Sequence, residues 1–304
     1  MSRLRKLSPA ALLLLALPLL AQNNTVVLKR AWVDHYKDRA TIDAGFFVDH
    51  AHKRPNQPAA DGDMHVAGRA PREVGLPMVA EVMNAAQPGQ AAAVAEIHAL
   101  EGKNQQAPVS GAWRFWFEHP AKRQVQFDDV PVAKNTNPDH SFEIHPISKF
   151  DRNGISGSFQ PIPGFQPYDA DKAFGLYEKL KVTVSANSSA ISISAAKAMY
   201  NYAKFEITLL GSPKKLDDGG YAVLANVNGA ADEAIASKVR MIFVPGTPPL
   251  QQLLTKKMGD GDTMRVIGIP RINLNAIETF ATASGGKSLT RKLPYEMIIA
   301  AVAK

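Results

Sequence analysis

The sequence predicts a mainly β protein with short helices, divided into two consecutive halves of similar design. Segments of alternating apolar and polar residues, typical of half-buried strands, recur along the chain. Their order around one helix is the same in both halves, although the residue identities do not repeat. The halves also differ in chemistry, because all eight His and all three Trp lie in the first. Residues 23–150 carry a formal net charge of −1 and residues 151–304 carry +5, which supports two domains.

In the first half we expect five strands and one helix. The strands are predicted at residues 45–49, 63–69, 78–83, 109–118 and 141–147. The Ala-rich segment 90–102 between the third and fourth strands is expected to be a helix, from its propensity and the spacing of its apolar residues. In the fourth strand Trp113, Phe115 and Phe117 share one face, so this face is expected to fill a core.

The second half repeats this order. Its strands are predicted at residues 204–210, 221–227, 238–244, 262–269 and 295–302. The sequence Asp-Asp-Gly-Gly at 217–220 favours a turn between the first two strands. Pro248 and Pro249 open a short helix that is expected to run to Met258, because proline is well placed in a first helical turn.

Each half therefore has the element order β-β-β-α-β-β, which is that of the OB-fold, a five-stranded Greek-key barrel. Two small α+β sandwiches of another topology are the alternative. We predict a signal peptide at 1–21, a first OB-like barrel at 22–149, a linker at 150–190 and a second OB-like barrel at 191–304. The linker is expected to contain a helix at 169–181 that Asp169 or Asp171 caps.

The N-terminal segment has the three-part pattern of a secretory signal peptide. Arg3, Arg5 and Lys6 precede an apolar run from Ala10 to Leu20, and Ala21 is a small residue at a cleavage-like position. The run is too short to span a bilayer, and no later segment is apolar enough to do so. We therefore expect an exported protein, periplasmic or extracellular, with an uncleaved N-terminal anchor as the alternative. The chain has no Cys, which excludes disulfides, cysteine nucleophiles and thiolate zinc sites.

Polar and ionisable residues gather where the first barrel would bind a ligand. OB-folds bind on the face of strands 2 and 3, between the loops that join strands 1–2 and 4–5. In the first half these loops are expected at 50–62 and 119–140. The candidate ligand-binding residues are His50, His52, Lys53, Arg54, Asp61, Asp63, His65, Arg114, Trp116, His119, His140, Glu143 and His145. Trp116 and Arg114 share a strand face and could form an aromatic platform for a sugar or a base, although buried aromatic residues are more common.

Part of this set resembles a known pattern. The sequence Asp-Gly-Asp-Met-His at 61–65, then Glu81, and Phe-Glu-Ile-His-Pro at 142–146 is similar to an uncharacterised family of exported bacterial proteins. These proteins carry a DGDxH strand and a closing E[IL]HP strand in an OB-like domain. The resemblance covers residues 31–150 and implies no established activity. The Asp-Gly-Asp triplet also resembles that of thermonuclease-type barrels, but the chain lacks a matching arginine-and-glutamate catalytic pattern.

A metal site is one interpretation of the same residues. His50 and His52 alternate along an extended chain, as do Asp61, Asp63 and His65, so each group would share a face. His50, His52, Asp63 and His65 could together hold a divalent transition metal. The alternative is a turn at Asp61 with solvated histidines, since no spacing matches a strong metal motif such as HExxH.

The sequence identifies no catalytic residue. It has no GxSxG nucleophile motif, and Gly-Gly-Lys-Ser at 285–288 lacks the first glycine of a phosphate loop. The leading hypothesis is an exported, non-enzymatic binding protein for an oligosaccharide, a nucleic acid fragment or a protein partner. One alternative is a metal-dependent hydrolase, acting for example on phosphodiesters, with the His/Asp site in the first barrel. The other is a structural protein of the cell envelope.

Overall fold

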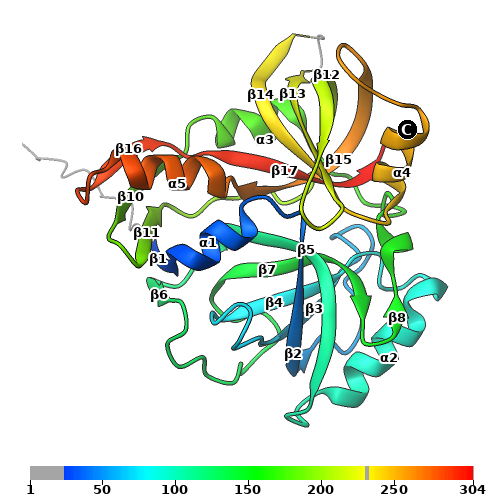
Figure 1. Ribbon diagram of the computed structural model, residues 1–304. Coiled ribbons are helices and arrows are strands. Elements are labelled where there is room, and N and C mark those ends of the chain that lie inside the picture. The colour runs from blue at the N-terminus through cyan, green and yellow to red at the C-terminus, as the bar shows by residue number, and fades with distance from the viewer. Residues whose placement is uncertain (1–23, 230–232, 304) are drawn as a thin grey trace, which may run out of the picture.

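The computed structural model describes residues 24–229 and 233–303, so the predicted signal peptide lies outside the described residues. The described residues form three β-sheets and five short α-helices. Two of the sheets are barrels that lie one above the other, with the third sheet beside them (Figure 1). Within residues 24–229 and 233–303, no helix combines the length and apolar character needed to span a membrane.

The first barrel is closed and five-stranded. It contains β2 (Thr41–Ala51), β3 (Met64–Arg69), β4 (Met78–Val82), β5 (Gln106–His119) and β7 (His140–Phe150). The strands pair in the order β4-β3-β2-β5-β7, and parallel pairing of β4 with β7 closes the sheet on itself. The 3₁₀ turn η1 (Pro88–Gln90) and helix α2 (Ala91–Leu100) connect β4 to β5, and Ile97 and Leu100 of α2 are buried.

The second barrel has the same plan. It contains β12 (Ala203–Lys215), β13 (Tyr221–Asn228), β14 (Ala234–Phe243), β15 (Thr263–Ile272) and β17 (Tyr295–Val302). Pairing of β12 with β13 closes this barrel, and β14 and β17 are its parallel pair. Helix α4 (Pro248–Thr255) connects β14 to β15 and begins with the two prolines.

Both barrels therefore have one topology. If the strands of each barrel are numbered along the chain, strand 1 pairs with 2 and 4, and strand 5 lies between 3 and 4. A single helix follows strand 3 in each case. This is the OB-fold arrangement, so the prediction of two tandem OB-like barrels is confirmed.

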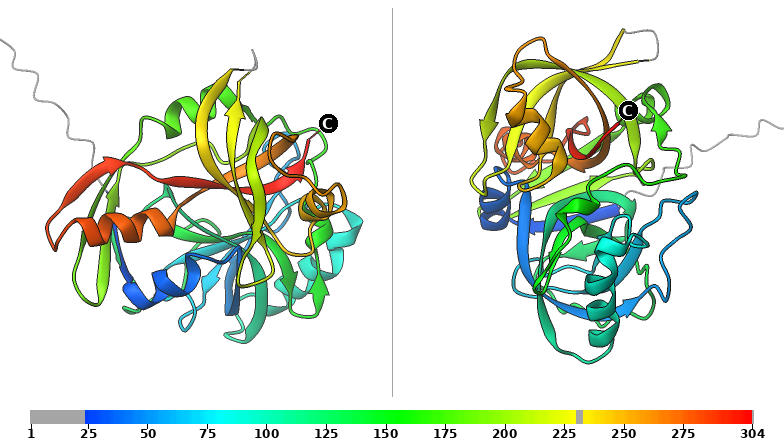
Figure 2. Two further views of the ribbon diagram at one scale, coloured as in Figure 1. Left: turned by 45° about the horizontal axis from the view of Figure 1, so that its top comes forward. Right: turned by 90° about the vertical axis from the view of Figure 1, so that its right-hand side faces the viewer.

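The third sheet joins segments that lie far apart in the sequence. Its strands are β16 (Leu289–Lys292), β10 (Lys181–Ala186), β11 (Ala190–Ala195), β1 (Asn24–Lys29) and β6 (Arg123–Val125), in that order. The edge strand β6 comes from the loop between strands 4 and 5 of the first barrel. The edge strand β16 comes from the equivalent loop of the second barrel. Helix α1 (Arg30–Tyr36) follows β1, and helix α5 (Leu274–Ala283) packs on β10. Figure 2 shows α1 at the level where the two barrels meet.

Residues 150–190 contain more structure than a simple connection. They include β8 (Asn153–Gly154), the 3₁₀ turn η2 (Ser156–Ser158), β9 (Tyr168–Asp169), helix α3 (Ala170–Tyr177) and β10. The side chain of Asp169 accepts a hydrogen bond from the backbone N–H of Lys172, so Asp169 is the N-cap of α3. It is one of the two residues, Asp169 and Asp171, that were expected to cap this helix. Phe174 and Tyr177 bury one face of this helix.

An apolar layer also lies between the barrels. Alternating residues of each strand fill the barrel interiors, for example Phe205, Ile207 and Leu209 of β12. The residues between them point to the outside of each barrel. A second set of apolar residues packs together on these outer surfaces. This set contains Met83 and Ala112 of the first barrel, Phe159, Ile162 and Tyr202 of the connecting segments, and Ile267, Ile269 and Ile298 of the second barrel.

Two buried arginines cross this junction in opposite directions. Arg114 of β5 donates from Nε to the carbonyl of Pro270 in β15, at 3.0 Å. Arg271, the next residue of β15, donates to the carbonyls of Arg39, Ala40 and Trp113, and its guanidinium lies 3.5 Å from the Trp113 ring centroid. Both side chains are fully buried. These hydrogen bonds set the position of one barrel on the other.

Candidate functional site

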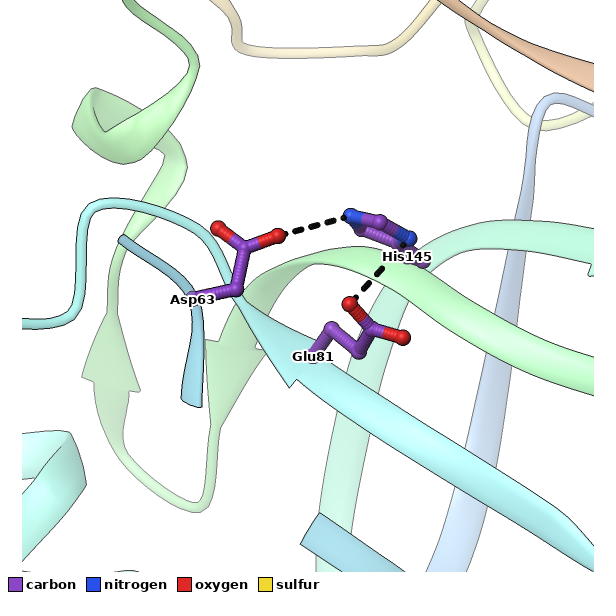
Figure 3. Close-up of side chains that lie close together, drawn as sticks. All are labelled: Asp63, Glu81 and His145. Atoms are coloured by element: carbon purple, nitrogen blue, oxygen red, sulfur yellow. Dashed lines mark ion pairs between the residues drawn. The ribbon is translucent and has the colours of Figure 1, made fainter. Parts of the chain in front are cut away.

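A group of ionisable side chains lies on the outside of the first barrel, across neighbouring strands. Asp63 directly precedes β3, Glu81 lies on β4 and His145 lies on β7 (Figure 3). Their chain neighbours Met64, Ala80 and Ile144 fill the barrel core, so alternation turns the ionisable side chains outward. The outward side chains are nevertheless buried, since Asp63 and His145 are 0% exposed and Glu81 is 5% exposed.

His145 lies between the two carboxylates. Its Nε2 atom is 3.3 Å from Asp63 Oδ2, and its Nδ1 atom is 3.5 Å from Glu81 Oε2 (Figure 3). Donor atoms of the three residues all lie within 4.8 Å of one another. His65, the cross-strand neighbour of Glu81, approaches the same Oε2 atom to 3.5 Å. Four residues from three adjacent strand segments thus converge on one buried spot.

Tyr202 covers this buried group of side chains and contacts two of them. It comes from the segment that leads into the second barrel, directly before β12. Its hydroxyl donates to Asp63 Oδ2 at 2.5 Å and lies 2.7 Å from His145 Nε2. Asp63 Oδ1 has no hydrogen-bond partner in the part of the chain that the structure describes.

Glu143, two residues before His145, is held by cations. Arg114 donates to Glu143 Oε2 at 2.5 Å and to Glu118 Oε2 at 2.7 Å. His140 Nε2 lies 3.2 Å from Glu143 Oε1, and His145 Nδ1 lies 3.3 Å from Glu143 Oε2. Glu143 therefore orients the imidazole of His145 from the side opposite Tyr202.

Burial and charge shift the acid strengths of this group. Burial raises the pKa of Asp63 and of Glu81 above the ordinary values. Burial alone would lower the pKa of His145, but Glu81, Asp63 and Glu143 together raise it well above its ordinary value. Burial would likewise raise the pKa of Glu143, yet Arg114 and the two histidines hold it well below its ordinary range. His145 thus lies within ion-pair distance of three carboxylates.

The binding face that OB-folds ordinarily use is covered in this barrel. Phe159, Ile162 and Tyr202 pack over it as part of the apolar layer between the barrels. A cavity of about 160 Å³ remains beside the site, lined by His65, Glu81 and Tyr202 among others. This volume accommodates an ion and several waters, at about 30 Å³ for each water, but not a sugar chain or an oligonucleotide.

The structure brings together only some of the residues that the sequence singled out. Asp63, His65, Arg114, His140, Glu143 and His145 form one connected cluster. His52 stacks on His65 at 4.6 Å between ring centroids, and His119 stacks on His140 at 5.2 Å. Asp61 lines the cavity and accepts a hydrogen bond from the backbone of Asp63.

The other predicted residues lie elsewhere. His50 faces Glu101 at 3.6 Å, away from Asp63, and Lys53 and Arg54 are exposed. Trp116 is only 1% exposed and packs edge-on against Tyr177, so its ring does not face solvent as an open platform. Sequence reasoning did not include Glu81 or Tyr202 among the site residues. Glu81 interrupts an apolar strand, which was a usable signal, whereas Tyr202 had none.

The equivalent face of the second barrel is covered only in part, where Ala40 packs against Ala222 and Ile242. A groove of about 650 Å³ runs over β12, β13 and Arg240 of β14 and reaches Asn275 of α5. Leu224, in the middle of β13, is 44% exposed in this groove. Lys214 and Lys215 line it, are exposed, and have no ion pair within residues 24–229 and 233–303. The first barrel therefore has a covered face, and the second keeps an accessible groove.

Comparisons with known proteins give no family. No protein-family model matches the chain, so none supports the resemblance to the family of exported bacterial proteins, and no curated protein is similar. Among solved structures, a deletion mutant of the single-stranded DNA binding protein from Thermus aquaticus is similar at 7% identity. The match covers 87% of this chain and 92% of that chain with a TM-score of 0.22. At this TM-score the similarity carries no weight for the fold or the ligand, which rest on the strand pairing and on the sites themselves.

Proposed function

We propose that this chain is an exported, non-enzymatic binding protein that holds an acidic segment of a partner protein on its second barrel. One observation carries the proposal: of two equivalent OB faces, the first is covered, whereas the second keeps an accessible groove beside the segment 37–41 that packs on it. OB-folds ordinarily bind ligands on this face, so the open copy is the natural site.

Charge on the open face favours an anionic ligand. Lys214 and Lys215 are exposed and lack ion pairs in the described part of the chain. Arg240 also lines the groove, where Glu296 fixes its guanidinium at 2.8 Å. Two aspartates lie in the groove as well, but Asp38 accepts a hydrogen bond from Asn275 and pairs with Arg240. The free charges are therefore mainly positive.

The shape of the face favours a polypeptide over a sugar or a nucleic acid. None of the groove-lining residues within residues 24–229 and 233–303 is aromatic, so bases and sugar rings have no ring on which to stack. Leu224 instead offers an exposed aliphatic contact between basic side chains. An apolar centre with a charged rim is typical of protein–protein contacts.

Fluorescence anisotropy tests the proposal. A short labelled peptide of Glu, Ser and Leu is titrated with the chain lacking residues 1–21, beside labelled oligouridylate and labelled oligogalacturonate. We expect the peptide to bind and the double variant Lys214→Glu/Lys215→Glu to lose that binding. Lys256→Glu/Lys257→Glu is the matched control, since this exposed pair follows α4 and does not line the groove.

The salt dependence and the other two probes show which results would support the proposal and which would contradict it. Peptide binding should weaken as salt rises, because salt screens exposed charges. Equal loss in both double variants would reduce the effect to overall charge and contradict the proposed site. Tighter binding of oligouridylate or oligogalacturonate than of the peptide would contradict the ligand class. Export is tested separately, by the N-terminal sequence of the protein recovered outside the cytoplasm, which we expect to begin near residue 22.

A further inference from the structure

A second site lies in the first barrel, independent of the open face. We propose that Asp63, Glu81 and His145 bind one divalent first-row transition metal ion, with His65 beside it. The donor set of one imidazole and two carboxylates is typical of zinc, manganese and iron sites. It differs from the set expected from the sequence, which combined His50 and His52 with Asp63 and His65.

The separations of the donor atoms fit such an ion. Metal–ligand bonds of about 2.1 Å in tetrahedral geometry place donor atoms about 3.4 Å apart. Asp63 Oδ2 and His145 Nε2 are already 3.3 Å apart. Ligand atoms of all three residues lie within 4.8 Å of one another, and the Glu81 carboxylate, which now approaches Nδ1 of His145 at 3.5 Å, would turn toward the ion to complete the arrangement.

Two of the carboxylates lack the hydrogen bonds that buried carboxylates need. Asp63 Oδ1 is fully buried and has no partner in the part of the chain that the structure describes. The Glu81 side chain makes no hydrogen bond within the same residues, and the ring nitrogens of His65 and His145 each lie 3.5 Å from its Oε2 atom. An unpaired buried polar group destabilises the folded protein, and a bound cation would remove that cost.

Charge balance leads to the same result. Arg114 is already shared by Glu143 and Glu118. His145 lies within 3.5 Å of Asp63, Glu81 and Glu143, so three buried carboxylates meet at one imidazole. A divalent ion at this point would supply positive charge to that group of carboxylates.

The surrounding residues already orient the ligands. With Nε2 toward the ion, the Nδ1–H of His145 would donate to Glu143, which Arg114 and His140 hold in place. A carboxylate behind a metal-bound histidine is the usual way in which proteins fix its tautomer and direction. The hydroxyl of Tyr202 lies between Asp63 Oδ2 and His145 Nε2, where it takes the place of the ion. The adjoining cavity of about 160 Å³ gives the ion a way in.

Cobalt titration tests the site directly. The chain without a His-tag is treated with a chelator and titrated with Co²⁺ by absorption spectroscopy, and with Zn²⁺ and Mn²⁺ by calorimetry. We expect one ion per chain and affinity at least about 100-fold lower in Glu81→Gln, because a direct ligand matters more than an outer-sphere group. Asp63→Asn serves as a second ligand variant should Glu81→Gln not fold, with folding checked by circular dichroism.

Two controls separate a metal site from general damage. Tyr202→Phe removes a polar group from the same buried cluster without removing a ligand, and it should bind the ion at least as tightly as the wild type. His50→Gln/His98→Gln removes two partly exposed histidines beside Glu101 and should leave binding unchanged. No stoichiometric ion in the folded wild type would overturn the site. Loss of binding in the His50/His98 variant, with Glu81→Gln intact, would assign the metal to the surface instead.

Discussion

Tyr202 donates a hydrogen bond of 2.5 Å to Asp63, although 139 residues separate them in the sequence. Asp63 belongs to the binding face of the first barrel, and Tyr202 belongs to the segment that leads into the second. The contact shows how the chain closes one OB face with its own connecting segment. The equivalent face of the second barrel is covered only in part, by Ala40 packed on Ala222 and Ile242, and it keeps an accessible groove. The roles that we propose for the two barrels rest on this difference.

Tyr202→Phe should lower the free energy of unfolding by about 1–3 kcal/mol, because it leaves a buried carboxylate oxygen of Asp63 without its donor. Urea unfolding followed by fluorescence measures this change. Tyr168→Phe is the matched control, since Tyr168 is 38% exposed and its hydroxyl makes no hydrogen bond in the described part of the chain. Equal effects of the two substitutions would show that the Tyr202–Asp63 contact does not stabilise the closed face.

Arg271→Met should destabilise the protein by about 3–5 kcal/mol, the usual result of breaking a buried ion pair. Arg271 is fully buried, pairs with Glu296 at 2.6 Å and donates to three backbone carbonyls of the first barrel. The control is Arg265→Met, because Arg265 lies on the same strand as Arg271 but is exposed and pairs with Glu206 at the surface. This substitution should lower the free energy of unfolding by no more than about 1 kcal/mol. Calorimetry of both variants checks the difference, and a cost for Arg271→Met as small as that of the control would mean that the junction does not depend on this arginine.

Glu143→Gln should change how stability depends on pH. The pKa of Glu143 in the folded protein lies well below its ordinary value, despite burial, because Arg114 and two histidines surround it. Its contribution is therefore present above the unfolded pKa of about 4.3 and is lost as the pH falls through the lower folded pKa. The wild type should exceed the variant in unfolding free energy at pH 7, and the gap should narrow below pH of about 4.3.

Urea unfolding of both proteins across this pH range provides the measurement. Glu206→Gln is a control, because Glu206 is partly exposed and pairs with Arg265 at the surface. A gap between the wild type and Glu143→Gln that does not change with pH would show that the carboxylate keeps an ordinary pKa in the folded protein.

The barrel strands could be predicted because their apolar residues alternate, as in 204–210 for β12. The third sheet could not, for reasons that differ among its strands. β6 has only three residues, two of them polar, and β16 has four that are mostly exposed, so neither shows an apolar pattern. β1 follows directly after the predicted signal peptide, and β10 and β11 lie in or at the end of a segment interpreted as a linker. Their pairing depends on contacts between distant parts of the chain.

The candidate site was predicted in part. The strand predicted at 141–147 carries Phe142 and Ile144 on its core face and Glu143 and His145 on the other, as alternation along a strand requires. His50 was expected beside Asp63, but the register of β2 against β3 shifts between Val48 and His50. This bulge changes the side on which the following residues lie, and His50 consequently faces Glu101. Burial of the whole group depends on the second barrel and could not be inferred from the first half alone.

Photo-crosslinking tests most directly the central claim that the partner binds on the second barrel. The acidic peptide of Glu, Ser and Leu, carrying a photoreactive group, is irradiated with the full mature chain, and the attachment sites are mapped by mass spectrometry. The structure predicts attachment between Leu210 and Leu224, around the open groove. Attachment within residues 41–150 would place the ligand on the covered barrel and contradict the account.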